Sequence, residues 1–127
     1  MTPEVARAIA EIGATFPENQ VQHTEDGQGG AYVRVLDLTL GEGFMNGTGW
    51  LGAHLTHLYP ATDVYPQYTR PDLKRPGDRD LGVALAPNVN WNGQPAMQIS
   101  RKSKCWDPNV DTAATKFQQV LAWLRST

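Results

Sequence analysis

QVQHTEDGQGGAYVRVLDLTL, residues 20–40, is the stretch that decides the fold. Its middle, Asp26-Gly27-Gln28-Gly29-Gly30, is rich in turn-forming residues and separates two β-prone runs, so it predicts a strand, a turn and a second strand. In the second run, 31–40, Val33 and Val35 alternate with Arg34, which is typical of a strand with one buried face. The stretch therefore favours an antiparallel sheet.

A third strand is predicted over Trp50–Leu58, after a glycine-rich turn at 41–49. There Leu51, Ala53 and Leu55 alternate with Trp50, His54 and Thr56. Four prolines between residues 59 and 76 predict an extended loop, and Val83–Leu85 is a candidate for a short fourth strand. Residues 86–107 show no sustained period, so we expect a long ordered loop.

Helices are predicted at both ends of the chain. Thr2 is a candidate N-cap and Pro3 suits the first helical position, with Gly13 as a stop. At the other end Asn109 or Asp111 is the expected cap. The apolar stripe of this second helix is Val110, Ala114, Phe117, Leu121 and Leu124. We expect a single α+β domain, 1–127, with a helix, a meander of three to four strands, a long loop and a helix packed on the sheet.

Composition excludes several function classes. Thirteen acidic and eleven basic residues give a net charge of -2, which does not favour nucleic acid as a partner. The single cysteine, Cys105, excludes an internal disulfide framework and a cysteine-based zinc site. We expect no membrane segment, no cofactor and no metal, the last because His54 and His57 would lie on opposite faces of one strand. The expected location is cytoplasmic.

Three motifs follow one another between residue 59 and the second helix. They are Tyr59-Pro60-Ala61-Thr62-Asp63-Val64-Tyr65-Pro66, then Ala86-Pro87-Asn88-Val89-Asn90-Trp91-Asn92-Gly93, then Trp106-Asp107-Pro108. In this order they resemble the Pro-rich turn, the His-Pro-Asn segment and the Trp-x-Pro segment of the ubiquitin-conjugating enzyme family. The resemblance covers about half of the chain and implies the UBC-like fold of that family.

The family's catalytic cysteine corresponds to Ala96, which has no nucleophile. Asn88 matches the family asparagine that stabilises the oxyanion or the loop. The resemblance therefore implies a divergent bacterial-type or catalytically inactive variant that binds a ubiquitin-like protein and, as a further partner, its activating enzyme. One alternative is an active thioester-forming enzyme that uses Cys105, beside the cations Arg101, Lys102 and Lys104.

Aromatic residues in these motifs are the candidate partner-binding residues. They are Tyr65 with Pro66 in the Pro-rich turn, Trp106, and Trp91, which its neighbours Asn90 and Asn92 indicate is exposed. A third hypothesis, unrelated to ubiquitin, is a peptide- or sugar-binding module centred on Trp91.

Overall fold

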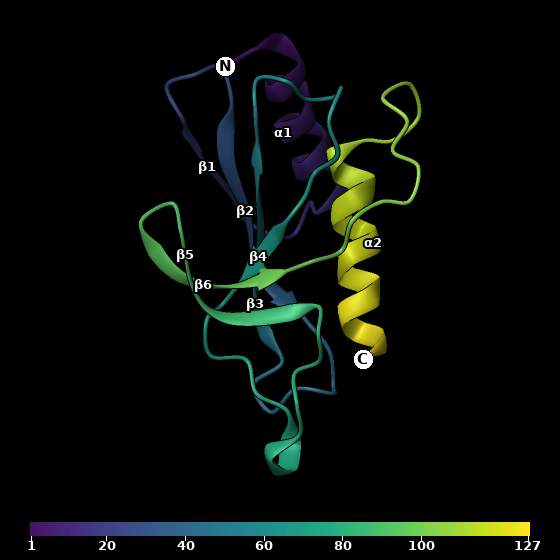
Figure 1. Ribbon diagram of the computed structural model, residues 1–127. Helices are drawn as coiled ribbons and strands as arrows, with labels where there is room; N and C mark the ends of the chain where they lie inside the picture. The colour runs from purple at the N-terminus through teal and green to yellow at the C-terminus, as the bar shows by residue number, and fades with distance from the viewer.

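The computed structural model describes residues 1–127 as two helices and a six-stranded antiparallel sheet (Figure 1). The helices are α1 (Pro3–Thr15) and α2 (Ala113–Ser126). The strands are β1 (Val21–Glu25), β2 (Ala31–Thr39), β3 (Thr48–Leu55), β4 (Gln67–Thr69), β5 (Leu85–Trp91) and β6 (Gln94–Ile99), arranged in the order β1-β2-β3-β4-β6-β5. The α+β class is confirmed. Neither helix combines the length and hydrophobicity that a membrane crossing needs.

The helix ends follow their capping residues. The Thr2 hydroxyl accepts a hydrogen bond from the Val5 N–H and Pro3 begins α1, both as predicted, but α1 continues past Gly13. Thr112, not Asn109 or Asp111, caps α2 through a reciprocal pair of hydrogen bonds with Thr115. The predicted stripe was therefore one turn too long, and Val110 is 72% exposed in the preceding loop.

The prediction of three to four strands and a long loop at 86–107 was wrong. Gln67–Thr69 pairs with both β3 and β6, inside the segment expected to be a proline-rich loop. Residues 85–99 form the β5–β6 hairpin, joined by a tight turn in which Asn92 and Gly93 have φ of 50° and 75°. The alternation was hidden because the hairpin is irregular and buries few of its side chains.

An irregularity in β5 bends this hairpin. Ala86 pairs with Gln98 and Val89 with Ala96, so Pro87 and Asn88 together oppose Met97. Such a β-bulge curves the strand that contains it, and Asn88 adopts φ 65°, a left-handed conformation that asparagine tolerates. The distal half of the hairpin consequently bends away from α2 (Figure 1).

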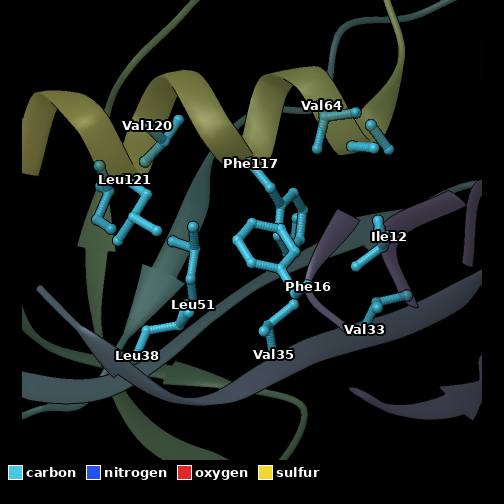
Figure 2. Packing of buried hydrophobic residues seen from close by; sticks show 14 of the residues in the cluster. Ile12, Phe16, Val33, Val35, Leu38, Leu51, Val64, Phe117, Val120 and Leu121 are labelled. Atoms are coloured by element: carbon cyan, nitrogen blue, oxygen red, sulfur yellow. The ribbon is translucent and has the colours of Figure 1, made fainter. Parts of the chain in front are cut away.

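The hydrophobic core lies between the helices and one face of the sheet. Phe117 is fully buried and projects from α2 toward Ile12, Phe16 and Val35 (Figure 2). From the sheet this core receives the odd-numbered residues of β2 and β3, as the alternation predicted: Val33, Val35, Leu51, Ala53 and Leu55. Tyr32, Arg34, Trp50 and His54 face the other side, whereas Leu38, beyond the irregularity in the β2–β3 register, returns to the core.

The two edge strands of the sheet differ. On β5, Pro87 and the bulge interrupt the outer row of backbone groups. On β1 the outer row of backbone groups is continuous. The Gln20 carbonyl accepts a hydrogen bond from the Leu36 N–H, and in an antiparallel pair every second residue from there directs its backbone groups toward the partner strand. Val21, His23 and Glu25 therefore direct their N–H and C=O groups away from β2.

Candidate functional site

The face of the sheet opposite the helices carries an aromatic cluster: Tyr32, Trp50, His54, Tyr68 and Trp91. The Tyr32 and His54 rings stack with centroids 4.2 Å apart, across paired positions of β2 and β3. The Trp91 ring reaches over from the hairpin, 5.5 Å from Trp50 and 5.2 Å from Tyr68 in near-parallel orientation. This cluster is a second, smaller region of packing.

Trp91 is therefore not exposed, and the prediction that it lies in an open loop was wrong. Its side chain is 7% exposed, and its Nε1–H has no hydrogen-bond partner. Gly52 makes room for it, since a Cβ on Gly52 would lie 2.8 Å from Trp91 Cη2. The bent hairpin brings the Trp91 ring onto the sheet. The polar neighbours Asn90 and Asn92 alone do not indicate this long-range contact.

Asp26 fixes one side of the cluster. Its Oδ2 lies 2.7 Å from His54 Nε2, while its Oδ1 accepts from the backbone N–H groups of Gln28 and Gly30. The hydrogen bond with His54 and those from the turn lower the pKa of Asp26 to about 2. The pair orients the imidazole but has no nucleophile among its contacts, so it is a structural link between the β1–β2 turn and β3.

A concave pocket lies beside His54, at the end of β3 and along the Pro-rich turn. We call it the Tyr65 pocket; it measures about 230 Å³. Its apolar lining consists of Leu55, Leu58, Tyr59, Val64 and Tyr65. Leu58 and Tyr65 are 52% and 43% exposed, so two large apolar side chains form an open rim around one hollow. Apolar rims of this kind are typical of protein-docking surfaces.

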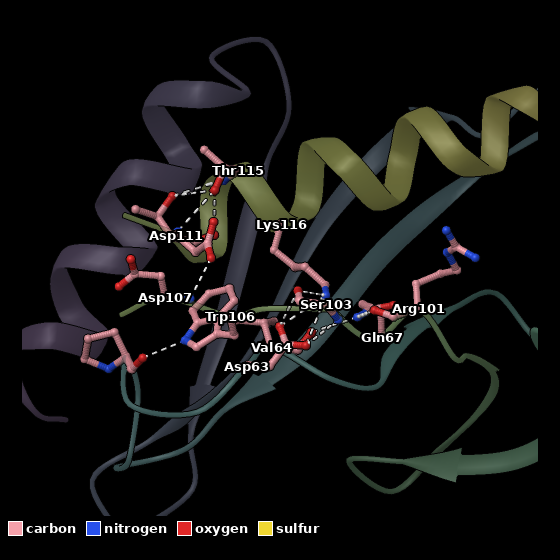
Figure 3. Close-up of polar contacts among 12 residues, drawn as sticks. Asp63, Val64, Gln67, Arg101, Ser103, Trp106, Asp107, Asp111, Thr115 and Lys116 are labelled. Atoms are coloured by element: carbon pink, nitrogen blue, oxygen red, sulfur yellow. Dashed lines mark hydrogen bonds and ion pairs between the residues drawn. The ribbon is translucent and has the colours of Figure 1, made fainter. Parts of the chain in front are cut away.

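An ion pair fastens the Pro-rich turn to α2 and to the loop after β6 (Figure 3). Lys116 Nζ lies 3.1 and 3.2 Å from the Asp63 carboxylate oxygens and donates to Ser103 Oγ at 2.6 Å. Burial alone would raise the pKa of Asp63, but the Ser103 N–H and the Lys116 ammonium outweigh it and lower that pKa. The Lys116 side chain is therefore engaged by Asp63 and Ser103 together, and the three residues form a structural connection between the Pro-rich turn, the loop after β6 and α2.

Trp106 strengthens the same connection. Its indole Nε1–H donates to the Pro60 carbonyl at 2.8 Å, and the Ala113 N–H donates to the Tyr59 hydroxyl at 2.9 Å (Figure 3 shows the first). Trp106 is half-buried, and the ring of Pro66 is partly covered. Trp106 therefore positions the Pro-rich turn, while Tyr65 is the aromatic side chain that projects from it.

The predicted catalytic residues do not converge. Asn88 occupies the bulge of β5 and makes no side-chain hydrogen bond, whereas Cys105 is exposed in the loop between β6 and α2. Figure 1 places the hairpin and this loop on opposite sides of the molecule. Ala96, at the expected nucleophile position, is fully buried in β6. The Cys105 thiol has no hydrogen-bonded base beside it. The backbone conformation of Asn88 is that of a residue in a β-bulge.

The three histidines are also separated. His54 faces the aromatic cluster, His57 lies in the turn beyond the end of β3, and His23 is exposed on β1. The prediction that His54 and His57 share one strand was wrong, because β3 ends at Leu55.

Leu58 and Lys116 were not predicted as site residues, although the sequence contains a signal for each. Leu58 has the same even-numbered spacing as Trp50, His54 and Thr56 in the strand predicted over 50–58. It is therefore an aliphatic residue on the strand face that was expected to be polar. Lys116 directly precedes Phe117 on the buried face of α2, where a lysine needs a partner. Neither signal identified the partner across the fold.

Comparison with known proteins finds no matching family model, no matching curated protein and no matching solved structure.

Proposed function

We propose that this chain is a non-catalytic UBC-like domain that binds a ubiquitin-like protein, or a component of its conjugation machinery, through the Tyr65 pocket. The observation that carries the proposal is the open apolar rim of Leu58 and Tyr65 around a concave site. Energetically dominant contacts in interfaces are typically aromatic or bulky apolar side chains that enter or surround a pocket.

Two further observations support this assignment. Tyr65-Pro66 belongs to the Pro-rich turn on which the resemblance to ubiquitin-conjugating enzymes rests, and this turn is held rigidly by Lys116, Trp106 and Tyr59. A docking surface on fixed backbone loses less entropy on binding than one on a loose loop. The buried alanine at position 96 and the separation of Asn88 from Cys105 favour binding over thioester chemistry.

The test is a calorimetric titration against a ubiquitin-like protein and an activating enzyme from the same genome. We expect Leu58→Asp and Tyr65→Ala each to weaken binding at least about tenfold, because both truncate the apolar rim. Val110→Asp is the matched control, since Val110 is an equally apolar exposed residue outside the pocket. Absence of binding to either protein, or equal weakening by Val110→Asp, would overturn the proposal.

The catalytic alternative is tested in the same preparation. The protein is incubated with ATP, the activating enzyme and the ubiquitin-like protein, and is then run on a non-reducing gel beside Cys105→Ser. We expect no new band in either lane. A band that dithiothreitol removes and Cys105→Ser lacks would instead make the chain a thioester-forming enzyme.

A further inference from the structure

Arg34 is a cation without a counter-ion on the aromatic face. Its Nη2 donates to Gln22 Oε1 at 2.8 Å and its Nη1 makes a long contact of 3.4 Å with Gln94 Oε1, both neutral acceptors. The guanidinium carbon lies 5.2 Å from the Trp50 ring centroid. None of the ion pairs of the protein includes Arg34. A guanidinium has five N–H donors, so most of its hydrogen-bonding capacity is free.

A shallow pocket of about 100 Å³ lies directly beside this guanidinium. We call it the Arg34 pocket. It is formed where the tip of the bent hairpin meets β1 and β2, and its walls include Gln22, Tyr32, Arg34, Asn92 and Gln94. No aspartate or glutamate lines it. His23 is a further lining residue, so the walls offer amide, imidazole and guanidinium groups, with Arg34 as the permanent positive charge.

The Arg34 side chain is also held in place before any ligand arrives. Gln22 lies directly opposite Arg34 in the β1–β2 register, Gln94 approaches from the hairpin, and Trp50 supports the planar group from one side. A preorganised guanidinium loses little entropy when it forms a two-pronged contact with a carboxylate. The volume accommodates one carboxylate side chain and is too small for a larger ring system.

We infer that the Arg34 pocket binds an acidic side chain from an extended segment of the protein partner. The inference rests on the proposed function for the partner's identity, but the acidic chemistry follows from the pocket itself. The Arg34 pocket contains Tyr32 and the Tyr65 pocket contains His54, and these two rings stack on each other. One partner can therefore reach both hollows, with an apolar contact at one and a carboxylate at the other.

The experiment titrates the ¹⁵N-labelled protein with a capped hexaglutamate peptide at low ionic strength and follows side-chain resonances by NMR. We expect saturable shifts at the Arg34 Nε–H and at the indole N–H groups of Trp50 and Trp91. Hexaglutamine should cause no shifts, and added salt should weaken the hexaglutamate complex. Arg34→Gln should lower the affinity at least about tenfold, and Arg34→Lys should lower it less because it keeps the charge without the planar fork.

The control variant is Arg7→Gln, which removes the same charge from the exposed surface of α1 and should leave the affinity within about twofold. Three results would overturn the inference: shifts centred on Arg101 and Lys102, unchanged affinity in a folded Arg34→Gln variant, or tighter saturation of the Arg34 signals by inorganic phosphate. Loss of ubiquitin-like protein binding with hexaglutamate binding intact would refute only the proposed function. The reverse pattern would refute only this inference.

Discussion

The two faces of the sheet come from the same strands but are built from different chemistry. On the face covered by α1 and α2, β2 and β3 contribute valine, leucine and alanine, and Phe117 closes the core. On the other face the intervening positions are Tyr32, Arg34, Trp50 and His54, covered in part by the β5–β6 hairpin. The helix-covered face excludes water, whereas the hairpin-covered face keeps polar groups and a pocket at its margin.

This difference separates stability from recognition. Aliphatic side chains packed against helices contribute mainly through burial, and they leave few groups for a ligand to contact. Aromatic, amide and guanidinium groups combine large contact area with hydrogen-bonding edges, which suits a surface that packs on one side and binds on the other. We therefore expect substitutions on the two faces to have different costs.

Phe117→Ala should have the largest effect. The side chain is fully buried between α2 and the sheet, so its removal leaves a cavity that the surrounding helices and strands cannot close. We expect a loss of about 4 kcal/mol in the free energy of unfolding, measured by urea denaturation. Gln118→Ala, exposed on the next position of α2, is the control. A loss below about 1 kcal/mol would mean that the helix-covered face is not the main core.

Lys116→Met tests a charged side chain that is buried on the helix side. It leaves the Asp63 carboxylate, 13% exposed, without its cation, and we expect a loss of about 3 kcal/mol. Lys104→Met removes an exposed lysine and should cost little. If the pair matters as a unit, adding Asp63→Asn to Lys116→Met should restore part of the loss. A strictly additive double variant would contradict the coupling.

Trp91→Ala should cost less than Phe117→Ala, about 2 kcal/mol, although tryptophan is the larger residue. The reason is that the aromatic cluster borders the Arg34 pocket, so water can enter the space that the ring leaves. The near-ultraviolet circular dichroism should change strongly while the helical signal is kept. Asn92→Ala, at the exposed hairpin tip, serves as the comparison. A cost equal to that of Phe117→Ala would remove the distinction between the two faces.

The smallest effect should appear with pH. The pKa of Asp26 is about 2 in the folded protein, below the ordinary aspartate value of 3.8, so its carboxylate favours folding above about pH 4. That contribution is lost as the pH falls toward 2, and Asp63, whose pKa is also lowered, acts in the same direction. The urea midpoint should therefore fall with acid, and less steeply in Asp26→Asn. As a control, Asp80→Asn should keep the dependence of the urea midpoint on pH that the unmodified protein has. If Asp26→Asn also kept that dependence, Asp26 would not be a source of the acid sensitivity.

Sequence patterns predicted the parts of the fold that depend on local spacing. The α1 cap at Thr2, the Asp26–Gly30 turn and the inward residues of β2 and β3 follow from periodicity and turn chemistry. The β5–β6 hairpin did not, because a bulge at Pro87 and Asn88 breaks the alternation and a three-residue strand, β4, connects it to the sheet. In the site, Tyr65 was predicted, but Leu58 and Arg34 acquire their significance only from neighbours distant in sequence.

The continuous outer row of β1 has a consequence for the protein in concentrated solution. Val21, His23 and Glu25 present unpaired backbone groups with no proline, lysine or bulge to prevent another strand from adding there. The other edge is blocked at Pro87, so growth through strand addition can proceed from one side of the molecule only. Pairing of two β1 strands therefore favours closed dimers over extended fibrils, and a proline placed at position 23 would suppress such self-association by removing an outward N–H group.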